Sequence, residues 1–128
     1  MNLSQRTGDS LDSPPRILIV CTDLIFSTKI TGTAKALGRT FAVARALPRL
    51  EELLAAGTPA LVIIDLAAAG IDPLEAIRRA KAQSPARVVA FLSHIETELA
   101  AEALGAGADS VMARSAFSVK LPEILTGV

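Results

Sequence analysis

The sequence contains no tryptophan, no tyrosine, one cysteine and one histidine. A single cysteine cannot form a disulfide within the chain or a cysteine-based zinc cluster. A single histidine likewise excludes a multi-histidine metal site. Since phenylalanine, at four copies, is the only aromatic residue, platforms on which bases or flavin rings could stack are almost absent.

An excess of charge of one sign is also missing, as are long apolar runs. The 13 basic and 13 acidic side chains balance, which leaves no general electrostatic reason to bind nucleic acid or an anionic membrane. The apolar runs are far shorter than the roughly 18 residues of a membrane-spanning helix, and the N-terminus lacks a signal-peptide pattern. We therefore expect a soluble, cytoplasmic protein that contacts neither nucleic acid nor membrane.

The chain divides into a short tail and one domain. Residues 1–15 are polar and rich in turn-forming residues, and they end in Pro14–Pro15, which predicts a disordered N-terminal tail. Residues 16–128 have the length and the apolar content of one domain with a sizeable core.

Short apolar runs alternate with helical patterns from Arg16 onward. The runs of strand length are residues 17–20, 41–46, 61–64, 88–92 and 110–113. The first, third and fourth are continuously aliphatic or β-branched, as is typical of a parallel strand covered on both faces. Five strands alternating with five helices predict an α/β fold with a doubly wound parallel sheet.

The helical patterns have recognisable ends. The first ends near Gly38, and the second begins near Pro48 and ends at Gly57. The third has Asp72 as N-cap, with Glu75 expected to close a capping box. The last two patterns span residues 96–104 and 117–125, and we expect Pro122 to kink the final helix or delay its start.

Polar residues follow the predicted strands at their carboxyl ends, where ligands bind in sheets of this kind. These residues are Cys21, Thr22 and Asp23 after the first strand, Asp65 after the third, Ser93 and His94 after the fourth, and Arg114 and Ser115 after the fifth. We expect them to line one crevice.

Three motifs carry a resemblance to a known family. Asp65 closes LVIID, Ser93 closes VVAFLS, and residues 107–117 read GADSVMARSAF. In these motifs the chain resembles the receiver domains of two-component response regulators, over residues 16–126. The resemblance implies a flavodoxin-like receiver architecture and a signalling module of a phosphorelay type system.

The resemblance also implies a phosphoryl-transfer site that this sequence has altered. In receivers, Mg²⁺ is held by the phosphoacceptor aspartate and by an acidic pair after the first strand. Asp65 stands at the phosphoacceptor position, but Cys21 and Thr22 stand where the acidic pair is expected. A thiol and a hydroxyl are poor ligands for this hard cation. We therefore expect no metal; an active site would need Asp65 and Asp23 to hold Mg²⁺.

Other departures from the family point the same way. Arg114 replaces the family's lysine and is suited to pairing with Asp65, and Ser115 replaces the proline after it. Val111 stands where receivers carry a switching aromatic residue. His94 replaces a small residue and could narrow the entrance to the site.

We therefore hypothesise a pseudo-receiver: a stand-alone, non-enzymatic module that binds a protein partner without being phosphorylated. The resemblance suggests a histidine kinase or a downstream regulator as partner. It also suggests a homodimer through residues 96–125, with Leu99, Ala103, Phe117 and Leu121 partly exposed.

Two alternatives remain open. The first is an active receiver phosphorylated on Asp65. The second is a flavodoxin-like binder of a small anion that uses Arg114, Thr22 and Ser93. For single residues, plainer roles compete: Asp65 as a structural acid, and Cys21 as a small buried hydrophobe.

Overall fold

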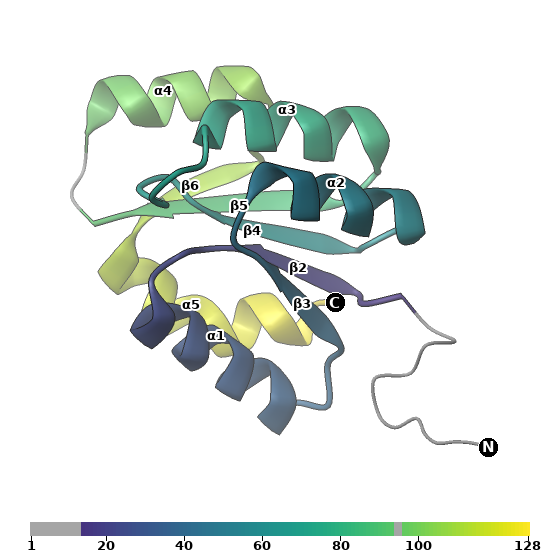
Figure 1. Cartoon of the computed structure of the whole chain (residues 1–128). Helices are drawn as coiled ribbons and strands as arrows, with labels where there is room; N and C mark the ends of the chain where they lie inside the picture. The colour runs from purple at the N-terminus through teal and green to yellow at the C-terminus, as the bar shows by residue number, and fades with distance from the viewer. Residues whose placement is uncertain (1–13, 94–95) are drawn as a thin grey trace.

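The computed structural model describes residues 14–93 and 96–128, so the predictions for the tail before Pro14 and for His94 lie outside the described residues. Strands and helices alternate along these two ranges (Figure 1). The strands are β2 (Ile17–Val20), β3 (Phe41–Ala44), β4 (Leu61–Asp65), β5 (Arg87–Leu92) and β6 (Ser110–Ala113). The helices are α1 (Leu24–Ala36), α2 (Leu47–Ala56), α3 (Pro73–Gln83), α4 (Thr97–Ala106) and α5 (Arg114–Thr126).

The described strands form one parallel sheet in the order β3-β2-β4-β5-β6. β3 lies on one side of β2, and β4 lies on the other side. The connection after β2 therefore leads toward one edge of the sheet, and the connection after β4 leads toward the opposite edge. The predicted doubly wound α/β fold is confirmed. In the described ranges, no helix is both long enough and apolar enough to cross a membrane.

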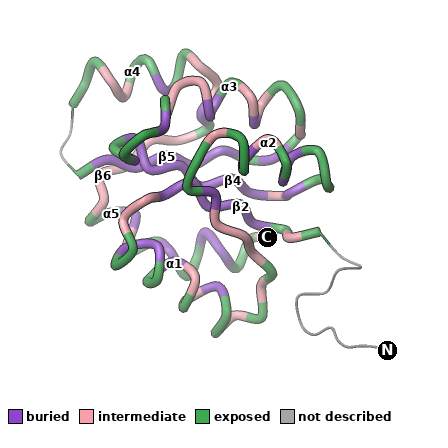
Figure 2. Tube along the Cα trace, viewed as in Figure 1, coloured by how far each residue is buried: buried purple, intermediate pink, exposed green. Residues whose placement is uncertain are grey.

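Two helical layers cover the two faces of the sheet. In Figure 1, α2, α3 and α4 lie on one face, and α1 and α5 lie on the other. Figure 2 shows that the central strands are buried while the outer sides of the helices are exposed. The strands therefore contribute apolar side chains to two cores, as a parallel sheet covered on both faces requires.

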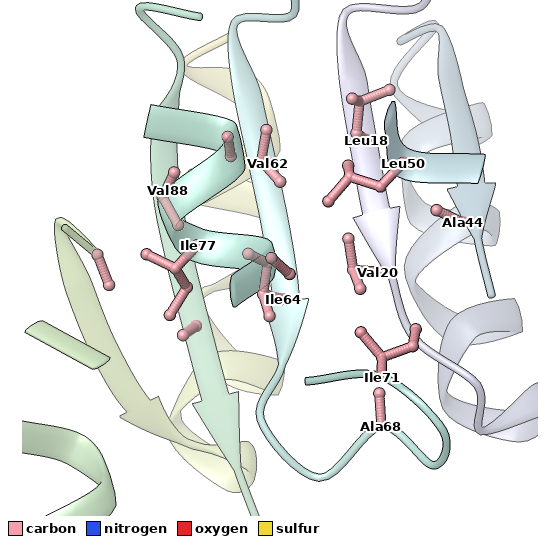
Figure 3. Close-up of a cluster of buried hydrophobic side chains, with 14 of the residues drawn as sticks. Leu18, Val20, Ala44, Leu50, Val62, Ile64, Ala68, Ile71, Ile77 and Val88 are labelled. Atoms are coloured by element: carbon pink, nitrogen blue, oxygen red, sulfur yellow. The ribbon is translucent and has the colours of Figure 1, made fainter. Parts of the chain in front are cut away.

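The residues of each strand alternate between the two cores. On the α2–α3–α4 side, Val20, Ile64 and Val88 pack with Leu50 and Ile77 (Figure 3). On the α1–α5 side, the cluster comprises Ile17, Ile19, Cys21, Phe26, Ile30, Ala34, Leu61, Ile63, Val89, Phe91, Phe117, Leu121, Ile124 and Leu125. Because the period of a strand is two residues, the last residue of β4, Asp65, faces α1 and α5 like Leu61 and Ile63.

Helix α3 begins at the predicted residue, but one predicted contact is wrong. The Asp72 carboxylate accepts hydrogen bonds from the backbone N–H groups of Leu74 and Glu75. The Glu75 carboxylate bonds to Arg78 and Arg79 instead of closing a capping box. Two guanidinium groups on the next turn are stronger partners for a carboxylate than one backbone N–H.

The last helix starts earlier than the sequence pattern predicts. Helix α5 begins at Arg114, directly after β6, and continues through Pro122. Pro122 is exposed, so its ring faces solvent, and the backbone bond that it cannot make is the main cost to the helix. As a result, Arg114 is the first helical residue of α5, and its side chain is fixed by the helix.

The far ends of α1 and α5 are also joined. The Arg39 side chain, which follows α1, donates hydrogen bonds to the carbonyl oxygens of Leu125 and Thr126 in the last turn of α5. The last carbonyls of a helix have no partner within it, and that of Leu125 also accepts the backbone N–H of Val128. Arg39 therefore caps α5 and ties it to the end of α1.

The surface between residues 96 and 125 differs from the prediction. Ala103, Phe117 and Leu121 are buried, because their helix positions face the sheet; Leu99 is half-buried, as expected. The large apolar side chains exposed on α4 and α5 are Leu104 and Val119.

The cap of α3 provides a test of the fold. We predict that Asp72→Ala lowers the free energy of unfolding by about 1 kcal/mol, because two N–H groups of the first turn lose their acceptor. Asp72→Asn keeps an acceptor oxygen and is expected to stay close to the wild type. Urea denaturation of the three proteins checks this; equal losses for both variants would show that the carboxylate acts by its charge and not as a cap.

Candidate functional site

The sheet register places Cys21 and Asp65 side by side at the point where the strand order reverses. β2 and β4 are neighbours, with Val20 paired with Ile64, so the next residue of each strand lies at the same edge. The Cys21 Sγ–H donates to Asp65 Oδ2 at 3.7 Å. In doubly wound sheets this position is the usual ligand-binding crevice, as the sequence predicts.

The Asp65 side chain is buried and fully engaged by its own chain. Only 2% of the residue is exposed. Asp65 Oδ1 accepts the backbone N–H of Ala67 at 2.9 Å. Oδ2 faces the Cys21 thiol and lies 3.6 Å from Arg114 Nη2. A buried carboxylate requires such partners, because burial without them costs several kcal/mol.

Arg114 connects both acidic residues of the site. Its Nη1 donates to Asp23 Oδ2 at 3.3 Å, and its Nη2 forms the ion pair with Asp65. The guanidinium carbon lies 4.3 Å above the centre of the Phe26 ring and 5.7 Å from that of Phe91. Among the described residues no partner reaches Arg114 Nε, which is buried. Arg114 is thus fixed by two carboxylates and an aromatic face.

An aromatic cluster forms the floor beneath this cation. Phe91 stacks on Phe117 with 4.7 Å between ring centres, and Phe26 lies 5.0 Å from Phe91. These rings were not predicted as part of the site. A signal was available, since phenylalanine is rare in the chain and Phe26 and Phe91 each lie near a strand end with candidate polar residues.

Asp23 and Thr22 hold the backbone around the site. Asp23 Oδ1 accepts the N–H of Phe26 and so caps α1. That bond and the neighbouring Arg114 hold the pKa of Asp23 below its usual value. Thr22 Oγ1 accepts the N–H of Ala69 at 2.8 Å, which joins the β2–α1 connection to the β4–α3 loop.

The other predicted residues lie apart from this cluster or outside the described ranges. Ser93 and Ser115 are exposed, and Val111 is half-buried in β6. None of the hydrogen bonds in the described parts of the chain joins Ser93 to Asp65. Arg45, which was not predicted as a site residue, donates to the carbonyl oxygen of Cys21 at 3.3 Å.

The residues present do not fit a magnesium ion. Mg²⁺ requires several oxygen ligands in an octahedron, whereas both carboxylates of the site, Asp23 and Asp65, are paired with Arg114, and a thiol faces Asp65. Within residues 14–93 and 96–128, no group of three or more histidine, cysteine or acidic residues could hold a metal ion.

Burial determines the chemistry of Cys21. The residue is fully buried, and burial raises the pKa of its thiol to about 11, with a smaller contribution from the Asp65 charge. The thiol is therefore protonated at neutral pH, which suits a hydrogen-bond donor and not a nucleophile.

The Cys21 thiol predicts a pH dependence of stability. An unfolded chain loses this proton near the reference pKa of 9.0, but the folded chain holds it up to about 11. We predict that, between these values, the wild type loses stability relative to Cys21→Ala, because ionisation favours the unfolded chain. Urea denaturation at a series of pH values checks this; a constant difference across the range would contradict it.

The Arg114 ion pair predicts a non-additive loss of stability. Arg114→Met is expected to lower the free energy of unfolding by about 1–3 kcal/mol, because the buried Asp65 carboxylate loses its cation. In an Asp65→Asn background the same substitution should cost less. A double-mutant cycle by urea denaturation measures the coupling. Equal losses in both backgrounds would show that Arg114 stabilises the fold through Asp23 and Phe26 and not through Asp65.

Comparisons with known proteins identify the fold but find no relative by sequence. The chain matches neither a family model nor a curated protein. It superposes on the NtrX receiver domain of Brucella abortus with a TM-score of 0.76 at 22% identity, covering 87% of this chain and 95% of that one.

Two other solved structures give similar values. A Burkholderia pseudomallei response regulator with a phosphorylated aspartic acid has a TM-score of 0.72 at 18% identity, covering 87% of this chain and 71% of that one. The BeF3-activated RstA receiver domain of Klebsiella pneumoniae has a TM-score of 0.71 at 22% identity, covering 85% and 97%. The chain therefore has the fold of response-regulator receiver domains.

Proposed function

We propose that the chain is a pseudo-receiver: a signalling module of the two-component type that binds a protein partner without being phosphorylated on Asp65. Its place of action is the cytoplasm, and it is not an enzyme. Its partner is a histidine kinase or a downstream regulator. The receiver fold supports the two-component context, and the occupied site around Asp65 supports independence from phosphorylation.

The Arg114 contacts carry the proposal. Phosphoryl transfer to a carboxylate needs a free oxygen on that carboxylate and positive charge to offset repulsion from the incoming phosphate. Here Arg114 is already shared between Asp65 and Asp23. Releasing it for a phosphoryl group would separate two ion pairs and the contact with Phe26.

The remaining Asp65 contacts support the same conclusion. The Ala67 N–H and the Cys21 thiol occupy Oδ1 and Oδ2 respectively. The hydrogen bond between Thr22 and Ala69 holds the two loops together above the crevice. In this arrangement, the chain keeps one conformation at the site, and a partner recognises that conformation directly.

Phosphorylation independence can be tested by amide NMR. We predict that Mg²⁺ with acetyl phosphate or beryllofluoride leaves the amide signals of residues 65–71 unchanged, because both oxygens of Asp65 already have partners and both carboxylates of the site are paired with Arg114. Specific shifts at these residues that vanish in Asp65→Asn would overturn the proposal and favour an active receiver.

A matched variant and a known receiver serve as controls. The triple variant Cys21→Asp, Thr22→Asp, Arg114→Lys restores two carboxylates and frees Asp65, so it is expected to gain Mg²⁺-dependent shifts around Asp65. The RstA receiver domain, which BeF3 activates, shows that the reagents are competent. A response from RstA without one from the wild-type chain is the expected pattern.

A further inference from the structure

The large exposed apolar side chains lie on two separate surfaces of the described structure. Leu24 and Ile25 begin α1 and are 66% and 86% exposed, and Val119 on α5 is 81% exposed. The fourth, Leu104 on α4, is 51% exposed. Soluble monomers tolerate single exposed apolar residues, but a cluster on adjoining helices indicates a contact surface.

The first surface is formed by α1 and α5, which pack against each other. We define the α1–α5 surface as Leu24, Ile25, Lys29, Val119 and Lys120. All five residues are exposed and lie in the first two turns of helices that begin at the same edge of the sheet. Helix α1 carries no acidic residue, and α5 carries one, the exposed Glu123, four residues after Val119. With Lys29 and Lys120 against Glu123, this surface combines apolar side chains with a net positive charge.

The second surface has the opposite charge. We define the α4 surface as Glu98, Glu102 and Leu104, all of them exposed. Helix α4 contains no basic residue, and its N-cap residue is another exposed acid, Glu96. Otherwise the helix is largely alanine and glycine, so another helix could approach it closely.

Helix α4 packs against α3 and β6 but leaves most of its residues exposed. Ala103 is the single residue of this helix that is fully buried. Figure 1 shows α4 on the face of the sheet opposite to α1 and α5. The two complementary surfaces of one molecule therefore cannot meet each other, but each can meet the other surface on a second molecule.

We propose that the α4 surface of one copy of this chain docks on the α1–α5 surface of another copy. Lys29 and Lys120 then face Glu98 and Glu102, while Leu104 packs on Leu24, Ile25 and Val119. The contact joins unlike surfaces, so successive copies can add head to tail. The inference goes beyond the proposed function, because none of these residues belongs to the Asp65 site.

The contact is small, which determines how it must be measured. One short helix on a two-helix surface falls in the class of weak interfaces, below about 1,200 Å² of buried surface. We expect a dissociation constant in the range of about 10–500 µM. It should depend strongly on salt, because the contact pairs exposed lysines of one copy with exposed glutamates of the other.

Sedimentation of the full chain tests the association. At about 50 mM salt, the weight-average mass is expected to rise more than twofold above that of the monomer as the concentration rises to about 1 mM. At about 500 mM salt it should fall back toward the monomer. A monomer at every concentration and salt would overturn the proposal.

Two charge-reversal variants test the orientation of the contact. Lys29→Glu with Lys120→Glu disables the α1–α5 surface, and Glu98→Lys with Glu102→Lys disables the α4 surface. Each variant alone should be monomeric, because its two surfaces then carry charge of the same sign. Their mixture should associate again, because the two variants carry opposite charges at both contacts. Self-association of either variant alone would show a different interface, including a symmetric one through residues 96–125.

The outcome can be separated from that of the proposed function. All substituted side chains are exposed, so circular dichroism and urea denaturation should show both double variants folded like the wild type. The variants leave Asp65 and Arg114 unchanged, so the NMR response to Mg²⁺ and beryllofluoride remains that of the wild type. If the chain is monomeric and its amide signals still do not respond to beryllofluoride, the proposed self-association is wrong and the pseudo-receiver proposal stands.

Discussion

A buried negative charge at the centre of the sheet edge is the constraint on which this structure depends. Asp65 ends β4 inside the α1–α5 core, where a carboxylate is stable only with compensation. Arg114 supplies a cation from the first residue of α5, and its position requires the aromatic floor of Phe26 and Phe91. Two strands and two helices are therefore positioned around one charge.

The fold follows from local patterns, and for that reason the sequence predicts it well. Continuous aliphatic strands, Asp72 before a proline, and glycines after helices are local signals whose meaning depends little on distant residues. The prediction that Pro122 could delay the start of the final helix was wrong, because α5 begins at Arg114 and continues through the exposed Pro122. Burial of Phe117 and Leu121 also depends on helix phase, which the pattern did not fix.

The site was predictable as a set of residues but not as a set of contacts. The carboxyl ends of the strands identify Cys21, Asp65 and Arg114 as neighbours. Sequence spacing cannot show that one guanidinium serves two carboxylates, or that Thr22 bonds to a backbone N–H across the crevice. Such contacts depend on rotamers and loop paths, and these are determined by packing across the whole domain.

The two arginines at opposite ends of the α1–α5 layer have a mechanical consequence. Arg114 links the start of α5 to Asp23, the cap of α1, and Arg39 links the end of α1 to the last carbonyls of α5. Because α1 and α5 are joined at both ends, they cannot slide or tilt independently, and we expect them to move as one rigid unit.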